Sequence, residues 1–134
     1  MINKIFVYGT LQRGMYNASF INDEWIDESI NATIQGDLYM VKWATFPAVI
    51  NVNSSENLVY GELYEIKEEF IKDAIEICDR LEGHPHFYKR EEVPVTDKNG
   101  YQHIAYAYIF IHKDEIGEKI RSGNYKEYYD YIAN

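Results

Sequence analysis

The sequence predicts an α+β fold in which five or six strands form a small, mostly antiparallel β-barrel flanked by helices. Short segments that alternate apolar and polar residues recur along most of the chain, and polar or glycine-containing turns separate them. Residues 67–81 instead repeat their apolar side chains every three or four positions, as one buried face of a helix does. A chain of 134 residues is long enough for one hydrophobic core, so we expect a single domain spanning residues 1–134.

The first half of the chain contains four expected strands and a brief helix at residues 17–20. The strands are residues 5–8, 32–40, 46–50 and 58–66. The first is a short apolar run that stops at Gly9, as a buried strand does when it leads into a functional loop. A bulge is expected at Gly36, inside the second strand. The polar turn at residues 53–57 predicts that the third and fourth strands form a hairpin.

The second half begins with the helix at residues 67–81, for which Gly83 is a natural C-terminal stop. Two further strands, at residues 88–96 and 101–111, flank the turn sequence Asn99-Gly100, and this pattern predicts a second hairpin. The tail from residue 114 to residue 129 is expected to form a short helix, a turn and a further helical turn.

Charge and cysteine content narrow the class of protein. Thirteen Lys and Arg against 22 Asp and Glu give a net charge of -9, which disfavours nucleic acid and anionic membranes as partners. Cys78 is the only cysteine, so an intramolecular disulfide is impossible, and its place on the apolar helix face predicts a buried thiol. The N-terminal residues have neither the pattern of a signal peptide nor that of a membrane span, and we expect a cytoplasmic protein that is a monomer or homodimer.

Three separated segments resemble one family in their order and spacing, over roughly residues 4–110. The first is Val7-Tyr8-Gly9-Thr10-Leu11, followed by Arg13-Gly14. The second is a repeated strand pattern, Gly36-Asp37-Leu38-Tyr39 with Phe46-Pro47-Ala48, and then Gly61-Glu62-Leu63-Tyr64. The third is Asp79-Arg80-Leu81-Glu82-Gly83 with Tyr88-Lys89-Arg90. Together they resemble the gamma-glutamylcyclotransferase-like superfamily. The resemblance is nearest to the gamma-glutamylamine cyclotransferase branch and to the small bacterial proteins similar to it.

The resemblance implies a small barrel flanked by helices, with a gamma-glutamyl substrate at one mouth and neither a metal nor an organic cofactor. It implies that Glu82 is the catalytic residue. Backbone amides of the first loop would bind the glutamyl α-carboxylate or the developing oxyanion, and that loop consists of Tyr8, Gly9, Thr10 and Leu11. Tyr88 is assigned to the substrate site, although a solvent-facing place on a strand pair fits its sequence context equally well.

The chemistry requires a base and needs no protein nucleophile. In a gamma-glutamyl amide the free α-amine attacks the γ-carbonyl and closes a five-membered lactam. An α-ammonium has a pKa of roughly 8, so a carboxylate in reach must accept a proton for attack near neutral pH. Glu82 would lie at the C-terminal end of a helix in a partly apolar pocket, and both the helix dipole and desolvation would raise its pKa.

Other interpretations of the same residues stay open. Without the resemblance, Glu82 would be a solvated helix-end carboxylate and Tyr8 a core aromatic. The His84-Pro85-His86 sequence is read as a turn with exposed imidazoles, because no third metal ligand stands at a supporting spacing. A non-catalytic module that binds an acidic or amino-acid-like ligand is the main alternative to the cyclotransferase. A third possibility is removal of a gamma-glutamyl group within a dedicated biosynthetic pathway.

Overall fold

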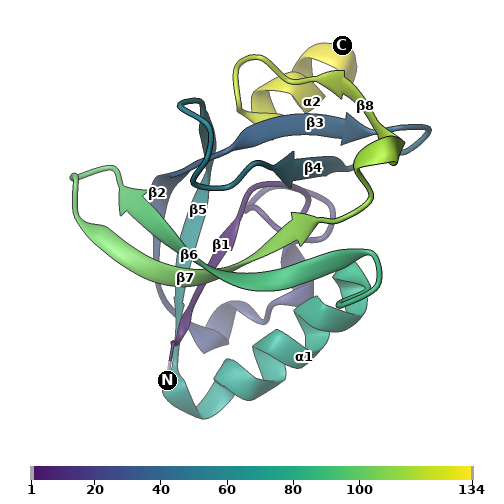
Figure 1. The fold of residues 1–134 in the computed structure, drawn as a ribbon. Helices are drawn as coiled ribbons and strands as arrows, with labels where there is room; N and C mark the ends of the chain where they lie inside the picture. The colour runs from purple at the N-terminus through teal and green to yellow at the C-terminus, as the bar shows by residue number, and fades with distance from the viewer. Residues whose placement is uncertain (1, 134) are drawn as a thin grey trace.

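The computed structural model describes residues 2–133, in which five strands close a barrel beside a smaller three-stranded sheet (Figure 1). In barrel order the strands are β1 (Lys4–Val7), β5 (Leu58–Ile66), β2 (Ile26–Gln35), β6 (Tyr88–Asp97) and β7 (Gln102–Phe110). The neighbours pair antiparallel except where β1 and β7 run parallel and close the barrel. The predicted α+β barrel is therefore confirmed, with one parallel contact among the antiparallel ones.

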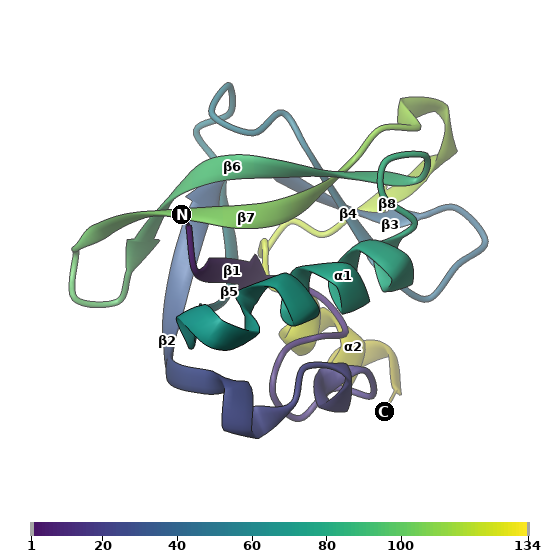
Figure 2. The same ribbon diagram turned by 90° about the horizontal axis from the view of Figure 1, so that it is seen from below.

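The second sheet lies between the barrel and the C-terminal helix. Its strands, in order, are β4 (Pro47–Ile50), β3 (Asp37–Val41) and β8 (Ile116–Lys119). Helix α2 (Tyr125–Ala133) lies beside this sheet, whereas helix α1 (Ile71–Glu82) lies on the far side of the barrel. Seen from below, α1 crosses the molecule in front of β1 and β5 (Figure 2).

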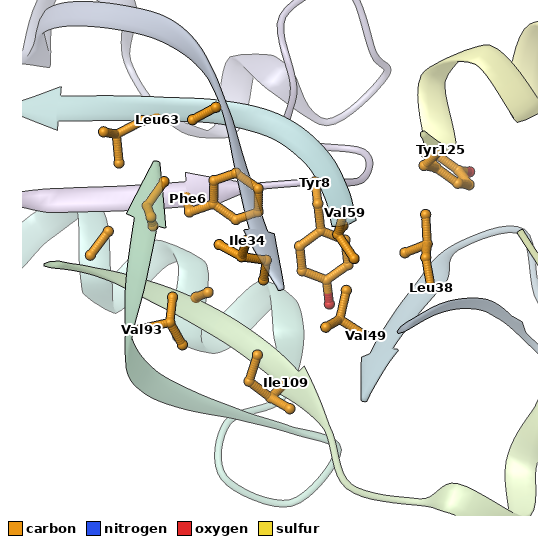
Figure 3. Close-up of a cluster of buried hydrophobic side chains, with 14 of the residues drawn as sticks. Phe6, Tyr8, Ile34, Leu38, Val49, Val59, Leu63, Val93, Ile109 and Tyr125 are labelled. Carbon is orange, nitrogen blue, oxygen red and sulfur yellow. The ribbon is translucent and has the colours of Figure 1, made fainter. Parts of the chain in front are cut away.

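Alternation along β1 divides the buried side chains between two cores. Phe6 and Tyr8 point into the barrel, where they join apolar residues such as Ile34 and Val59 (Figure 3). Ile5 and Val7 face the opposite way and pack in the layer that α1 covers. Each strand residue thus contributes to one core or the other, as the two-residue period of a strand requires. The end of β1 is therefore packed on one side by the barrel core and on the other by the core under α1.

The helix and the second hairpin are confirmed with small shifts in their ends. A 3-10 turn, η3 (Glu68–Phe70), precedes α1, so the regular helix begins at Ile71. Strands β6 and β7 pair along their whole length, from Tyr88 opposite Phe110 to Thr96 opposite Gln102. The brief helix predicted at residues 17–20 is a 3-10 turn, η1 (Ala18–Phe20), and a second such turn, η2 (Asp23–Trp25), leads into β2.

The expected single strand at residues 32–40 is wrong. The chain forms a long strand, β2, which begins six residues earlier than expected, and then a separate strand, β3. Gly36 lies between them, and its N–H donates to the carbonyl of Asn57 at 3.0 Å rather than continuing either ladder. The residue marks a change of sheet, and the predicted bulge is absent.

The expected hairpin between residues 46–50 and 58–66 is also wrong, because β4 pairs with β3 and β5 pairs with β1 and β2. The buried carboxylate of Asp37 explains the fold of this segment. It accepts hydrogen bonds from Asn51 and Asn57 at 2.8 Å and from Ser55 at 2.7 Å. These bonds fold the polar turn back over the start of β3, so that β4 aligns with β3 instead of β5.

The first helix expected in the tail is a strand. A 3-10 turn, η4 (Lys113–Glu115), leads into β8, and the N–H of Lys42 donates to the carbonyl of Glu115 at 2.7 Å. Pairing with the free edge of β3 therefore outweighs the helical tendency of this segment. Among the described residues, no helix combines the length and the hydropathy that crossing a membrane requires.

Candidate active site

A pocket opens where the ends of several elements meet: the end of β1, the end of α1, and the starts of β4 and β6. About 370 Å³ in it is free of protein atoms, including the part open to solvent. Its lining residues are Phe6, Val7, Tyr8, Gly9, Thr10, Leu11, Phe46, Pro47, Glu82, Tyr88 and Tyr108. Among these lining residues Glu82 is the one that carries a charge, so a single carboxyl group dominates the local electrostatics.

Glu82 is the last residue of α1, and the following glycine fixes it there. Gly83 takes a left-handed conformation with φ of 66°, which a residue without a side chain adopts at little cost. The N–H of His84 then returns to the carbonyl of Asp79 at 2.9 Å and closes the helix end. The predicted stop at Gly83 thus decides where the Glu82 side chain lies.

The carboxyl group of Glu82 is poised to exchange a proton near neutral pH. The residue is partly exposed, but desolvation of its carboxyl raises the pKa of Glu82 to about 7. Within the described part of the chain, this carboxyl forms no hydrogen bond and no ion pair. The rise in pKa was expected from the sequence, and burial is the cause that acts in the structure.

Gly9 is required at the start of the loop by close packing. A methyl group added to Gly9 would lie 2.9 Å from Cγ of Pro47, a contact that a side chain could not make without moving the proline ring. The loop from Gly9 to Leu11 therefore lies directly against the start of β4. No hydrogen bond among the described residues uses the backbone N–H groups of Gly9, Thr10 or Leu11 as a donor, so these groups are available to a ligand.

The carbonyl groups of the same loop all accept hydrogen bonds from other parts of the protein. Gly9 accepts from the backbone N–H of Gln12 at 3.2 Å, and Thr10 accepts from the backbone N–H of Asn17 at 3.0 Å. The Tyr64 hydroxyl donates to the carbonyl of Leu11 at 2.9 Å. With its carbonyls engaged, the loop is fixed in an orientation that leaves its N–H groups as unused donors.

Three tyrosine hydroxyls in the pocket wall donate to protein acceptors. Tyr8 donates to the carbonyl of Tyr108 at 2.5 Å, Tyr88 donates to the carbonyl of Pro47 at 2.5 Å, and Tyr108 donates to the carboxylate of Asp79 at 2.7 Å. Burial, reinforced by the negative charge of Glu82, raises the pKa of Tyr8 and that of Tyr88. Both phenols therefore stay neutral at physiological pH.

Asp79 ties the end of α1 to the barrel. Its carboxylate pairs with Arg90 on β6 and accepts the Tyr108 hydroxyl from β7. The backbone N–H of Arg90 also donates to Nδ1 of His84 at 2.9 Å, in the connection that follows the helix. Because Asp79 lies about one helical turn before Glu82, these contacts hold the catalytic candidate over the pocket.

The structure brings all six predicted site residues, Tyr8, Gly9, Thr10, Leu11, Glu82 and Tyr88, to this one pocket. It also adds lining residues that the sequence did not assign to the site. Phe46 and Pro47 belong to a segment that resembles the family, and this resemblance could have identified them. Tyr108 gave no such signal, because nothing in the β7 sequence distinguishes its neighbours from ordinary strand residues.

Two other predicted features lie outside the chemistry of the pocket. Cys78 is fully buried, and burial, with smaller contributions from Glu82 and Asp79, raises the pKa of its thiol to about 12. Among the described residues, one group of possible metal ligands, His112, Asp114 and Glu115, has side-chain atoms within 4.8 Å of one another. It includes neither His84 nor His86 and does not line the pocket.

Comparison with known proteins gives consistent matches. The family model described as "Gamma-glutamyl cyclotransferase, AIG2-like" matches residues 5–127. A Methanocaldococcus jannaschii protein named "Putative gamma-glutamylcyclotransferase MJ1514" is 29% identical over 126 residues, which cover 92% of this chain and 96% of that protein. "Gamma-glutamylaminecyclotransferase A" of Danio rerio is 29% identical over 111 residues, covering 78% of this chain and 66% of that protein.

A solved structure has the same fold. The crystal structure of YkqA from Bacillus subtilis superposes with a TM-score of 0.74 at 28% identity. The match covers 99% of this chain and 43% of the YkqA chain, so this chain corresponds to less than half of that protein.

Proposed function

This chain belongs to the AIG2-like gamma-glutamyl cyclotransferase family, and on that premise we propose that it cleaves a gamma-glutamyl amide to 5-oxoproline and a free amine. One observation carries the proposal. The desolvated, unpaired carboxyl of Glu82 shares a small pocket with the unused N–H groups of residues 9–11. The reaction needs one proton acceptor and one set of fixed anion donors, and this pocket supplies both.

The glutamyl group would bind with its negative oxygen atoms toward the loop. Backbone N–H groups of Gly9, Thr10 and Leu11 suit the α-carboxylate or the oxyanion that forms on the γ-carbonyl. The α-amine would then lie toward Glu82, across the pocket from the loop. Folding the substrate in this way brings its amine and its γ-carbonyl carbon together, which converts cyclisation into a positioned intramolecular step.

Glu82 moves the protons of this reaction. Its carboxylate accepts a proton from the α-ammonium, the free amine forms the new C–N bond to the γ-carbonyl carbon, and an oxyanion develops. The oxyanion collapses and breaks the original amide C–N bond, while the Glu82 carboxyl returns its proton to the departing nitrogen. The ring nitrogen loses a second proton to the leaving amine, so the products are 5-oxoproline and an ammonium ion.

The charge of the pocket favours a leaving group that lacks a carboxylate. No Lys or Arg occurs among the lining residues, so a carboxylate on the leaving group would have no cation to pair with there and would face Glu82. A gamma-glutamyl amine meets neither problem. The D. rerio relative, which is named a gamma-glutamylamine cyclotransferase, agrees with this preference.

The proposal is tested by incubating the protein with gamma-glutamyl amines, gamma-glutamyl amino acids and gamma-glutamyl peptides and measuring 5-oxoproline. We expect turnover of gamma-glutamyl amines, and loss of about 100-fold or more in Glu82→Gln, since a general acid–base group contributes about 10²–10⁴ in rate. Glu76→Gln is the matched control, because Glu76 lies on the exposed face of the same helix. Ligand binding without 5-oxoproline would instead identify the non-catalytic module, and an active Glu82→Gln would remove Glu82 from the mechanism.

A further inference from the structure

Glu62 is a buried acidic residue that the chemistry of the pocket does not use. It lies on β5, on the same strand face as Tyr64, and 7% of its surface is exposed. It is not among the residues that line the active-site pocket. Burying a carboxylate costs free energy unless hydrogen bonds or ion pairs compensate for the lost water. The partners of Glu62 therefore indicate which part of the protein this carboxylate holds in place.

Three groups surround the Glu62 carboxylate. The backbone N–H of Arg13 donates to Oε1 at 2.7 Å, and the Ser29 hydroxyl donates to Oε2 at 3.2 Å. Nζ of Lys126, on α2, lies 3.9 Å from Oε1. The bond from Arg13 is the shortest of the three contacts, and a charged acceptor makes such a bond about twice as strong as a neutral one does. Arg13 is therefore the main partner of Glu62.

Glu62 thereby holds both ends of the loop that carries the unused N–H groups. Its backbone lies opposite Val7 in the pairing of β5 with β1, where the chain enters the loop. Its carboxylate binds Arg13, where the chain leaves the loop. Between these points the carbonyl of Gly9 accepts from the N–H of Gln12 at 3.2 Å and closes a tight turn. A short turn anchored at both ends by one strand has few orientations open to it.

Removing this acceptor would release the loop at its Arg13 end. A buried N–H that loses its acceptor must find water or another oxygen atom, so the backbone at Arg13 would move. The Tyr64 hydroxyl would still donate to the carbonyl of Leu11 at 2.9 Å, and the loop would remain attached to the barrel. A misplacement of about 1 Å in groups that position a substrate can cost about 100-fold in rate. A loss of orientation without unfolding is therefore sufficient to affect catalysis.

We propose that Glu62 is a positioning residue, whose carboxylate binds the N–H of Arg13 and so holds residues 9–11 in the orientation that leaves their N–H groups free for a ligand. This inference rests on the proposed cyclotransferase function, in which those N–H groups are the anion donors. The alternative is a purely structural role, in which Glu62 supports β2 through Ser29 or α2 through Lys126.

The test separates the acceptor of Glu62 from its charge and its size. Glu62→Gln keeps an oxygen acceptor for the Arg13 N–H and removes the charge, whereas Glu62→Leu has a similar size and removes the acceptor. Ser29→Ala and Lys126→Met are the matched controls, because each removes one of the other two contacts of the same carboxylate. Urea unfolding establishes that each variant is folded, and the formation of 5-oxoproline from a gamma-glutamyl amine then gives kcat/KM.

We expect Glu62→Leu to lower kcat/KM by about 10- to 100-fold. Glu62→Gln should recover most of this loss, because a neutral oxygen still accepts from the Arg13 N–H. Both controls should match the unmodified protein. Equal impairment of Glu62→Gln and Glu62→Leu would overturn the inference, and so would full activity of a folded Glu62→Leu. A loss in either control as large as that in Glu62→Leu would identify the structural role instead.

Amide hydrogen exchange of the unmodified protein gives a result that depends neither on turnover nor on the folding of any variant. The N–H of Arg13 should exchange slowly, and the N–H groups of residues 9–11 should exchange rapidly until L-glutamate is added. Rapid exchange at Arg13 would overturn the inference even if Glu62→Leu does not fold.

The two proposals fail separately. Formation of 5-oxoproline that depends on Glu82 and is unaffected by Glu62→Leu would reject the positioning role and retain the cyclotransferase. If the unmodified protein forms no 5-oxoproline, the affinity for L-glutamate takes the place of kcat/KM. A loss of that affinity in Glu62→Leu and its recovery in Glu62→Gln would then retain the positioning role in a binding module. The absence of both turnover and L-glutamate binding would reject both proposals.

Discussion

Removing the Glu82 carboxyl should stabilise the folded protein, and the gain should grow with pH. The pKa of Glu82 is about 7 in the folded chain, against an ordinary value of 4.5. A group whose folded pKa is raised binds its proton more tightly in the folded state. Ionising it therefore weakens folding, and the penalty develops as the pH rises from the unfolded pKa to the folded one. Glu82→Gln, which stays neutral, escapes that penalty.

The size of the effect follows from the difference between the two pKa values. Each pKa unit corresponds to 1.36 kcal/mol, so the full penalty reaches about 3 kcal/mol above about pH 8 and vanishes near pH 4. Between about pH 5.5 and 8.5, the linkage relation predicts a change of about 2 kcal/mol. This pH-dependent part is the quantity of interest, because the substitution also has a constant effect on packing.

Urea unfolding of both proteins at several pH values measures this difference. The free energy of unfolding of Glu82→Gln minus that of the unmodified protein should increase with pH by about 2 kcal/mol over the range above. The control Glu76→Gln removes an exposed carboxylate that pairs with Arg80 at 3.0 Å, and its difference should stay flat. A flat difference for Glu82→Gln, or one that decreases with pH, would refute the desolvated site and weaken the case for Glu82 as base.

Three further predictions test the neighbourhood of the site and the fold. Gly9→Ala should displace Pro47, lower the free energy of unfolding by about 1–3 kcal/mol and reduce 5-oxoproline production at least tenfold; Gly117→Ala, with its nearest contact at 3.4 Å, should change neither by as much. Cys78, with a raised pKa, should react with a thiol reagent at pH 8 at the rate of global unfolding, and rapid labelling of the folded protein would contradict its burial. The hydrogen bonds to Asp37 lower its pKa, so the ionised Asp37 carboxylate stabilises the folded protein at pH values above the unfolded pKa. This stabilisation of the fold is lost as the pH falls through the folded pKa. Asp37→Ala should therefore lower the free energy of unfolding by about 1–3 kcal/mol at pH 7 and by less at pH 3, in thermal or urea unfolding.

Local patterns in the sequence were sufficient for the elements that local rules govern. The helix that carries Glu82 has a clear apolar repeat, and Gly83 ends it because the left-handed conformation there suits a residue without a side chain. Asn99-Gly100 marked the hairpin of β6 and β7, where Gly100 has a φ of 88°. The site residues, a loop glycine and a helix-end glutamate, came instead from the family resemblance, because local rules alone would leave Glu82 as a solvated carboxylate at a helix end.

The sequence by itself therefore determined the class of fold, the C-terminal end of α1 and, through the family resemblance, the residues worth testing. Tertiary structure alone decided which strands pair, because Asp37 directs its turn through side-chain bonds between residues 14 to 20 positions apart, and no local pattern encodes them. It also decided that Glu82 and the first loop line one pocket. Three features of the site depend on groups that are distant in sequence: the desolvation of the Glu82 carboxyl, the ion pair of Asp79 with Arg90, and the hydrogen bond from the Tyr88 hydroxyl to Pro47. These groups come together only once the barrel has closed.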